Sequence, residues 1–334
     1  MAILDDSGLP GRVGGLEIVR RLGRLQITHA VHDVDGTHSL IRDWMPVMSA
    51  ILHCAITSGL PEDFDSEESR RRVVAQVEKE PLPETDRFCV ESGGMSALSQ
   101  MEWAIRRGIE EGTIRVSDRA LSEEQNAVNS AIVGRMWEGE ERFPDLRESP
   151  QVTDYIGEKA PRLFRFYEAV LNEARRDRNL AAAREDPRAW RVPGSLEFLE
   201  HLRRAGVSNY FVTGAVISDA ETPRGMAEEL LALGFGIGRG KVVEGIRGSS
   251  WEEKLPKDEL IAGLLEELGV EGGRVLVVGD GRSEVRAGVG LGAAVMSRLP
   301  PEAGRQREVH RRLGTNYIVV DYTEPALLQL VRVE

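Results

Sequence analysis

The stretch His32-Asp33-Val34-Asp35-Gly36-Thr37 decides the fold of this chain. The apolar run 27–31 ahead of it predicts a buried strand, and this run stops at two carboxylates. In an extended chain Asp33 and Asp35 point to the same side, and Gly36 lets the backbone turn just beyond them. A hard cation such as Mg²⁺, a shared proton, or one acid beside one ionised group can hold such a pair together. All three arrangements suit phosphoryl transfer through an aspartyl-phosphate, and an ordinary Asp-Gly turn is the alternative.

Composition limits the class of protein. The 334 residues are 41% hydrophobic, which predicts a buried core in about two domains. A net charge of −12 argues against a broad basic surface for nucleic acid or an anionic membrane. The sequence has no apolar run of the roughly 18 residues that a membrane span needs, and its first 15 residues do not resemble a signal peptide. We therefore expect a cytoplasmic protein with no nucleic-acid or membrane partner, in which Cys54 and Cys89 are reduced.

The pattern between residues 44 and 190 is helical. Leu98, Met101, Ile105 and Ile109 fall on one helical face, and Ser122 with Gln125 forms a capping box before another helix. No strand alternation interrupts this segment, whereas the first 26 residues show no decisive periodicity. The segment 44–190 therefore predicts a helical domain inserted after the first strand.

From residue 192 onward helices alternate with apolar strands. Ser195 is predicted to cap a helix that ends at Gly206. The expected strands are 207–212, 241–244, 274–279, 293–296 and 317–320, and the expected helices between them include 225–233 and 256–268. This alternation predicts an α/β, Rossmann-like core with a mostly parallel sheet and helices on both faces. The core comprises residues 1–43 and 191–334, and the all-helical insertion is a cap domain of residues 44–190.

Polar residues end several of the expected strands. The carboxyl ends of parallel strands share one edge of a sheet, so the fold should gather these residues in one crevice. They are Asp33, Asp35, Thr213, Gly214, Asp280 and Glu284.

These residues resemble the motifs of the haloacid dehalogenase (HAD) superfamily of phosphohydrolases. The matching segments, in the family's order, are Asp33 to Thr37, Thr213-Gly214, a lysine, and Gly279 to Glu284. That family places a helical cap after the first motif, where this chain has its helical insertion. Arg42-Asp43-Trp44, Gly93-Gly94 and Gln100-Met101 are similar to a narrower phosphatase-like branch. His32 stands where relatives usually carry an apolar or aromatic residue, and we expect it to pack.

The resemblance implies a role for each matching residue. Asp33 would be the nucleophile and Asp35 the general acid and base. Mg²⁺ would be held by Asp33, the backbone carbonyl of Asp35 and Asp280, with Glu284 as a direct ligand or one step removed. Thr213 and the Gly214 amide would bind phosphoryl oxygens.

Two lysines compete for the remaining catalytic role. Lys254 lies in the loop before the expected helix 256–268, and Lys257 lies in its first turn. The helix dipole disfavours a cation at that end, so the presence of Lys257 there indicates a nearby anion. Its spacing to the end of this helix also resembles the family better, and we choose Lys257.

The expected function is hydrolysis of a small phosphorylated metabolite, with a sugar or polyol phosphate as our guess. Substrate choice should come from the cap. The candidates for substrate contact there are Arg42, Trp44, Gly93, Gly94 and Gln100. A phosphomutase on the same core and a non-catalytic binding protein that keeps the fold are the alternatives. The sequence leaves the oligomeric state open.

Overall fold

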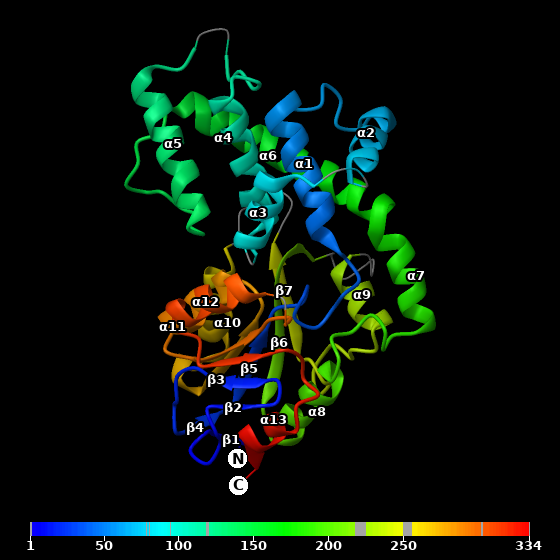
Figure 1. Ribbon diagram of the computed structural model, residues 1–334, viewed down its shortest axis with the longest axis vertical. Helices are drawn as coiled ribbons and strands as arrows, with labels where there is room; N and C mark the ends of the chain where they lie inside the picture. The colour runs from blue at the N-terminus through cyan, green and yellow to red at the C-terminus, as the bar shows by residue number, and fades with distance from the viewer. Residues whose placement is uncertain are drawn as a thin grey trace. The chain divides into compact units, whose positions relative to one another are not determined.

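The computed structural model describes residues 2–77, 79, 81–93, 95–117, 120–217, 225–249, 256–301 and 303–333 (Figure 1). The chain divides into two compact units. We call them the α/β unit, which contains the chain up to Ile41 and the described residues from Asn179 onward, and the helical unit, Arg42–Arg178. The sequence placed these two boundaries at residues 44 and 190. The α/β unit extends back to Asn179 because Leu180 and Ala183 pack against its residues Val34 and Ile41.

The α/β unit is built on an eight-stranded sheet with the order β2-β3-β10-β9-β8-β5-β6-β7. The strands from β10 to β7 in that order run parallel, and β3 and β2 are antiparallel additions at one edge. This sheet confirms the predicted α/β class. Its strands are β2 (Arg12–Val13), β3 (Leu16–Ile18), β5 (His29–His32), β6 (Ser208–Val216), β7 (Gly245–Ser249), β8 (Val275–Gly279), β9 (Ala294–Arg298) and β10 (Tyr317–Val319).

The apolar run before the first motif belongs to two sheets. A separate three-stranded sheet has the order β11-β1-β4, with β11 (Val331–Val333), β1 (Ala2–Asp5) and β4 (Arg24–Ile27). The chain changes sheets at Thr28, whose backbone bonds Arg274 and Ser208 at the start of the neighbouring central strands. The buried strand that the sequence predicted over 27–31 is therefore β5, one or two residues later than expected.

Helices cover both faces of the central sheet (Figure 1). Apolar residues of α8 and α13 pack with Ala30, Leu276 and Val278 on one face. Residues of α10 and α11 pack with Val31 and Val277 on the other, as the alternation of side chains along a strand requires. The helices are α7 (Asp177–Glu185), α8 (Ser195–Arg204), α9 (Met226–Ala232), α10 (Lys257–Leu268), α11 (Arg282–Gly290), α12 (Gly304–Leu313) and α13 (Pro325–Leu330).

Two local predictions in this unit are wrong. Residues 241–244 do not form the expected strand; the strand, β7, begins directly after them at Gly245. Within 241–244 the structure has an isolated bridge between Val243 and Ile237. Ser195 does not cap α8, because Gly194 with φ 74° occupies the cap position and Ser195 is the first helical residue. The Ser195 hydroxyl instead contacts the ring of His38.

The helical unit contains α1 (Trp44–Ser58), α2 (Glu67–Val77), α3 (Pro83–Glu91), α4 (Ala97–Glu110), α5 (Glu123–Trp137) and α6 (Pro150–Leu171), followed by a π-helical turn, Asn172–Arg176. The predicted apolar stripe of α4 is buried, and the capping box of Ser122 and Gln125 is present at the start of α5. The chain leaves the α/β unit after Ile41 and re-enters it at Asn179, where the Asn179 amide donates to the Ile41 carbonyl at 2.8 Å.

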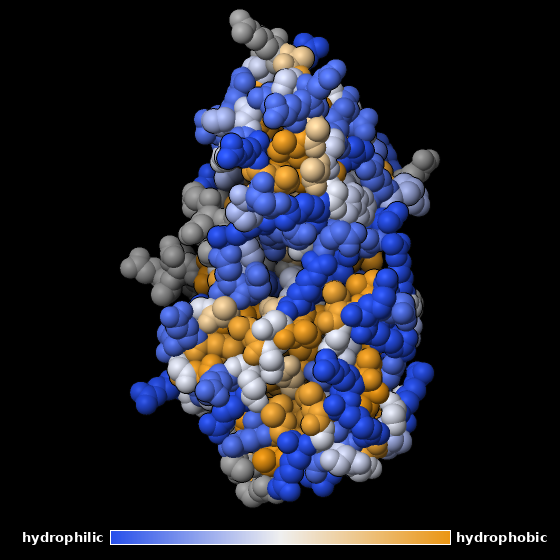
Figure 2. All heavy atoms as spheres, turned by 90° about the vertical axis from the view of Figure 1, so that its left-hand side faces the viewer, coloured by the Kyte–Doolittle hydropathy of each residue, from blue (hydrophilic) through white to orange (hydrophobic). Residues whose placement is uncertain are grey.

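The surface of the described residues is mixed in character. On the face shown in Figure 2, hydrophilic side chains are interspersed with apolar ones. The most exposed large apolar side chains belong to separate elements, as with Leu231 of α9, Leu328 of α13 and Val333 of β11. Within the described ranges, no helix is both long and apolar enough to cross a membrane. Cys54 and Cys89 are both free thiols.

Candidate active site

Asp33 follows β5 directly and continues its line. The Asp33 backbone N–H donates to the carbonyl of Val278 in β8 at 2.8 Å, so the parallel ladder extends to this residue. Its side chain is 5% exposed. Side chains alternate along a strand, so Asp33 lies on the same face as Val31, which packs against α10 and α11.

Lys257 is the first residue of α10, and it contacts Asp33. Its ammonium group donates to Asp33 Oδ1 at 2.5 Å and also to Glu284 Oε1, and all three side chains are buried. Burial alone would lower the pKa of Lys257, but the charges of Asp33 and Glu284 outweigh it and raise that pKa well above its usual value. Lys257 is therefore a buried, charged ammonium group beside the first carboxylate of the motif. Lys254, its competitor, lies outside the described residues.

Asp280 and Glu284 come from the end of β8 and the first turn of α11. Burial raises the pKa of Asp280, and the nearby carboxylates of Asp33 and Glu284 and a hydrogen bond with Asp33 raise it further. Burial also raises the pKa of Glu284, although Lys257 opposes that shift. Gly279 makes this packing possible, since a Cβ there would lie 2.5 Å from Glu284 Cγ. The fold thus brings Asp280 to Asp33, as the strand ends predicted.

The loop after Asp33 is held against Asp280. Gly36 has φ 75°, and a Cβ on it would lie 2.2 Å from Asp280 Oδ2, so only glycine fits this turn. Thr37 Oγ1 donates to Asp280 Oδ1 at 3.3 Å. Arg298, at the end of β9, donates to the Gly36 carbonyl at 2.9 Å. Asp35 is half-buried in this loop and forms a backbone bridge with Ser39.

Arg298 is a site residue that sequence reasoning missed. It also donates to the Val320 carbonyl at 3.0 Å, so it joins the end of β10 to the first motif. The expected strand 293–296 stopped two residues short of it. A charged residue at the carboxyl end of a mostly apolar parallel strand is the signal that could have found it.

Thr213 and Gly214 lie inside β6 rather than beyond its end. The strand continues to Val216, but its pairing with β7 shifts register between Val212 and Val216. Thr213 is buried, and its hydroxyl oxygen accepts the N–H of Ala215 at 3.1 Å. The hydroxyl proton of Thr213 is therefore directed elsewhere and can be donated.

The candidates for substrate contact in the helical unit are largely engaged within that unit. Arg42 is buried and donates to Glu168 at 3.2 Å, and Gln100 is buried and donates to Ser92 Oγ at 2.8 Å. Trp44 begins α1 and is half-buried, as is Gly93, two residues beyond the end of α3. Gly94 lies outside the described residues. Their role toward a substrate stays a prediction.

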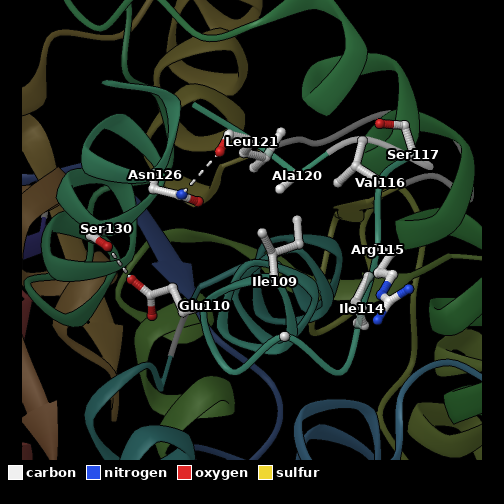
Figure 3. Close-up of a pocket in the computed structure, with 11 residues that line it drawn as sticks. Ile109, Glu110, Ile114, Arg115, Val116, Ser117, Ala120, Leu121, Asn126 and Ser130 are labelled. Atoms are coloured by element: carbon white, nitrogen blue, oxygen red, sulfur yellow. Dashed lines mark hydrogen bonds between the residues drawn. The ribbon is translucent and has the colours of Figure 1, made fainter. Parts of the chain in front are cut away.

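The helical unit contains a cavity of about 630 Å³ (Figure 3). It lies between the end of α4, the following segment and the start of α5, where Ser130 donates to Glu110 and Asn126 donates to the Leu121 carbonyl. None of the described residues that the sequence proposed for substrate contact lines it. This cavity therefore adds no support to those assignments.

The carboxylates of Asp33, Asp280 and Glu284 are the candidate ligands for a magnesium ion. Among the described residues, no three Asp, Glu, His or Cys side chains converge as a ready metal cage. Asp33 and Glu284 each give one oxygen to Lys257, Glu284 Oε2 is buried without a hydrogen-bond partner among the described residues, and Asp33 and Asp280 are adjacent carboxylates. Mg²⁺ is commonly held by one or two carboxylates, with substrate phosphate and water completing its shell. The pair of Asp33 and Asp280 fits that mode, and the wider ligand set expected from the sequence stays a prediction.

Comparisons with known proteins give a likeness of structure. No family model and no curated protein matches the sequence. Solved structures that resemble this chain include a candidate β-phosphoglucomutase from Bacteroides vulgatus, at 14% identity and TM-score 0.49, over 91% of this chain and 90% of that one. A candidate phosphoglycolate phosphatase from Lactobacillus delbrueckii subsp. bulgaricus shares 14% identity at TM-score 0.47, over 92% and 99% of the two chains.

A third similar structure is a HAD family hydrolase from Deinococcus radiodurans R1 with bound phosphate and sodium. It shares 15% identity at TM-score 0.41, over 93% of this chain and 100% of that one. The three structures are named as a phosphoglucomutase, a phosphatase and a HAD family hydrolase.

Proposed function

We propose that this chain is a Mg²⁺-dependent, HAD-type phosphatase that hydrolyses a small phosphorylated metabolite through an aspartyl-phosphate on Asp33. One observation carries the proposal: the buried Lys257 ammonium group contacts Asp33 where Asp33 meets Asp280. The ammonium group pairs directly with the carboxylate that would attack phosphorus. The same positive charge would attract a phosphate dianion into a site that is otherwise acidic.

The reaction proceeds in two steps. In the first, a carboxylate oxygen of Asp33 attacks phosphorus while the ester P–O bond breaks, and Asp35 gives its proton to the departing alkoxide oxygen. In the second, water attacks the phosphoenzyme, Asp35 takes the proton of that water, and the bond from Asp33 to phosphorus breaks. Inorganic phosphate then leaves and Asp35 holds a proton again. The Thr213 hydroxyl and the Gly214 amide would donate to the phosphoryl oxygens.

Bound Mg²⁺ would supply charge neutralisation between the carboxylates and the phosphate. Asp33, Asp280 and the backbone carbonyl of Asp35 are the groups we assign to it. Glu284 acts, in our proposal, through the Lys257 ammonium group, which it helps to fix beside Asp33. Its second oxygen, Oε2, is buried without a hydrogen-bond partner among the described residues, so direct ligation through Oε2 stays part of the proposal.

The helical unit is, in our proposal, the cap that selects the substrate. A sugar or polyol phosphate remains the suggested class, with Arg42, Trp44, Gly93, Gly94 and Gln100 as the suggested contacts. We also propose a cytoplasmic location, which follows from the composition considered above.

The test is phosphate release from a panel of sugar, polyol and carboxylic-acid phosphates in the presence of Mg²⁺. The matched variant is Asp33→Asn, which keeps the side-chain shape and removes the nucleophile. Intact-mass measurement on quenched reactions should show one added phosphoryl group in the wild type and none in the variant. Return of labelled phosphate to the substrate would identify a mutase. A folded Asp33→Asn protein with wild-type turnover would refute the mechanism.

A further inference from the structure

Two histidines bracket the loop that carries Asp33 and Asp35. His32 is the last residue of β5 and His38 follows Thr37, and both side chains are fully buried. The Nε2 atom of His38 lies 3.1 Å from Nδ1 of His32, in hydrogen-bond contact. This bond joins the residue before Asp33 to a residue three positions after Asp35. Together with the backbone N–H groups of His38 and Ser39, which donate to the Val34 carbonyl at 2.8 and 2.9 Å, it closes the loop at its base.

The direction of this hydrogen bond follows from its neighbours. Asn209 of β6 donates through Nδ2 to two backbone carbonyls, those of Leu199 and Val242, at 3.0 and 2.9 Å. Carbonyls only accept, so the amide orientation is fixed and Asn209 Oδ1 is the atom that faces His32 Nε2, at 3.3 Å. His32 must then carry its proton on Nε2, which leaves Nδ1 to accept from His38.

The assignment of donors and acceptors continues from His38 to Ser195 of α8. His38 donates through Nε2, so in the neutral ring its Nδ1 accepts, and the group that donates to it is the Ser195 hydroxyl at 2.7 Å. The result is one directed chain of donors from Ser195 through His38 and His32 to Asn209.

Aromatic rings fix the orientation of His38. Its ring stacks on Tyr322 at a centroid distance of 5.0 Å and an interplanar angle of 1°, and Tyr322 stacks on Phe198 at 5.0 Å and 12°. The His38 carbonyl accepts the Val192 N–H at 3.1 Å. The ring therefore has few alternative positions, and its hydrogen bond to His32 is directional.

We propose that His32 and His38 are positioning residues for the phosphatase reaction: their ring-to-ring hydrogen bond holds the base of the loop and so sets Asp33 against Asp35. The inference rests on the proposed function. Arg298 and Asp280 bind the far part of the loop, at Gly36 and Thr37. Among the side-chain contacts described above, only the bond between His32 and His38 joins the two ends of the loop. Displacing a reacting group by about 1 Å can lower turnover by about 10²-fold.

Two variants of His38 separate the hydrogen bond from the packing. His38→Phe keeps a ring on Tyr322 and loses both hydrogen bonds. His38→Gln loses the ring stack but keeps an amide nitrogen that reaches the Nε2 position and can donate to His32. We expect His38→Phe to lower kcat by about 10- to 10²-fold with KM nearly unchanged, and His38→Gln to stay within about threefold of the wild type.

The control is His201→Phe, which removes a histidine bond to the Val331 carbonyl at the end of α8, away from the loop. It should leave kcat unchanged. Thermal midpoints are measured for all variants. As a readout that needs no folded variant, ¹⁵N spectra of the wild-type histidine rings should show both His32 and His38 as Nε2–H tautomers.

Each outcome decides the inference. It is overturned if His38→Phe keeps wild-type kcat, if His38→Gln loses as much kcat as His38→Phe, or if the spectra show an Nδ1–H tautomer at either ring. A wild-type protein that releases no phosphate from the panel defeats the proposed function first, before any variant is compared. The inference then falls with it. A wild-type enzyme that turns over and a fully active His38→Phe would overturn the inference alone.

Discussion

Replacing Lys257 by methionine should cost both turnover and stability. The variant Lys257→Met keeps the length and apolar stem of the side chain and removes its charge. Lys257 contacts Asp33 and Glu284, and the three side chains are between 2% and 5% exposed, so solvent screens these contacts little. Removing one partner from a buried ion pair typically costs 3–5 kcal/mol, and we expect about 3 kcal/mol at pH 7.

The loss of stability in Lys257→Met should depend on pH. Without the ammonium group, burial and the other carboxylates raise the folded-state pKa of Glu284 above its unfolded value. The folded variant then binds more protons than the unfolded chain, so its stability falls as pH rises above about 4.3. The stability difference from the wild type should therefore be largest near pH 7 and shrink towards pH 5.

The assay is urea unfolding in the presence of a chelator at pH 7 and pH 5, together with turnover in Mg²⁺. Turnover should drop by about 10²-fold or more, as when a preorganised charge is removed from an active site. The control is Lys241→Met at an exposed lysine of the same unit, which should change stability by no more than about 0.5 kcal/mol. A Lys257→Met protein that loses less than about 1 kcal/mol and keeps its turnover would refute the reasoning.

Three further results are expected. Gly36→Ala should abolish most turnover and lower the thermal midpoint more than Gly206→Ala, because both glycines have positive φ but only the Cβ at position 36 meets Asp280; equal effects of the two would contradict this. Exhaustive chelation should stop turnover and added Mg²⁺ restore it, which phosphate release measures, and full activity in chelator would remove the metal from the site. Burial lowers the pKa of His310 to about 4, so this residue alone should lower the unfolding free energy by about 3 kcal/mol between pH 6.5 and 4, in addition to the contributions of the buried His32 and His38; His310→Phe should make this slope shallower in urea titrations, and an unchanged slope would exclude a contribution from His310.

The convergence of Asp33 and Asp280 was predictable because it follows from a general rule of parallel sheets. Each residue ends an apolar strand, and β5 and β8 prove to be neighbours. Lys257 was predictable for a different reason, since a cation at the start of a helix needs an anion to offset the dipole. Asp33 and Glu284 provide that anionic partner.

The contacts of His38 could not be predicted from sequence. Its partners Ser195 and Tyr322 lie far along the chain, and no local pattern marks a ring stack or a hydrogen bond between buried side chains. His32 packs as expected, but its bond to His38 depends on a turn whose geometry only the structure supplies. The strands within the first 26 residues could not be predicted either, because a strand of two to four residues is too short to show a clear hydrophobic periodicity.

The hydrogen bond between Asn179 and Ile41 has a consequence for how this architecture can change. The chain leaves the α/β unit after Ile41 and returns to it at Asn179, and these two residues are in contact. Residues 42–178 are therefore an insertion whose two ends lie next to each other. Closing a flexible loop of that length would cost on the order of 4 kcal/mol in chain entropy, so such an insertion is best tolerated when it has a core of its own. A different self-sufficient insertion could be grafted between these two points without altering a single strand pairing of the sheet. In the proposed function, specificity would therefore change through the insertion while the sheet and the residues around Asp33 stay the same.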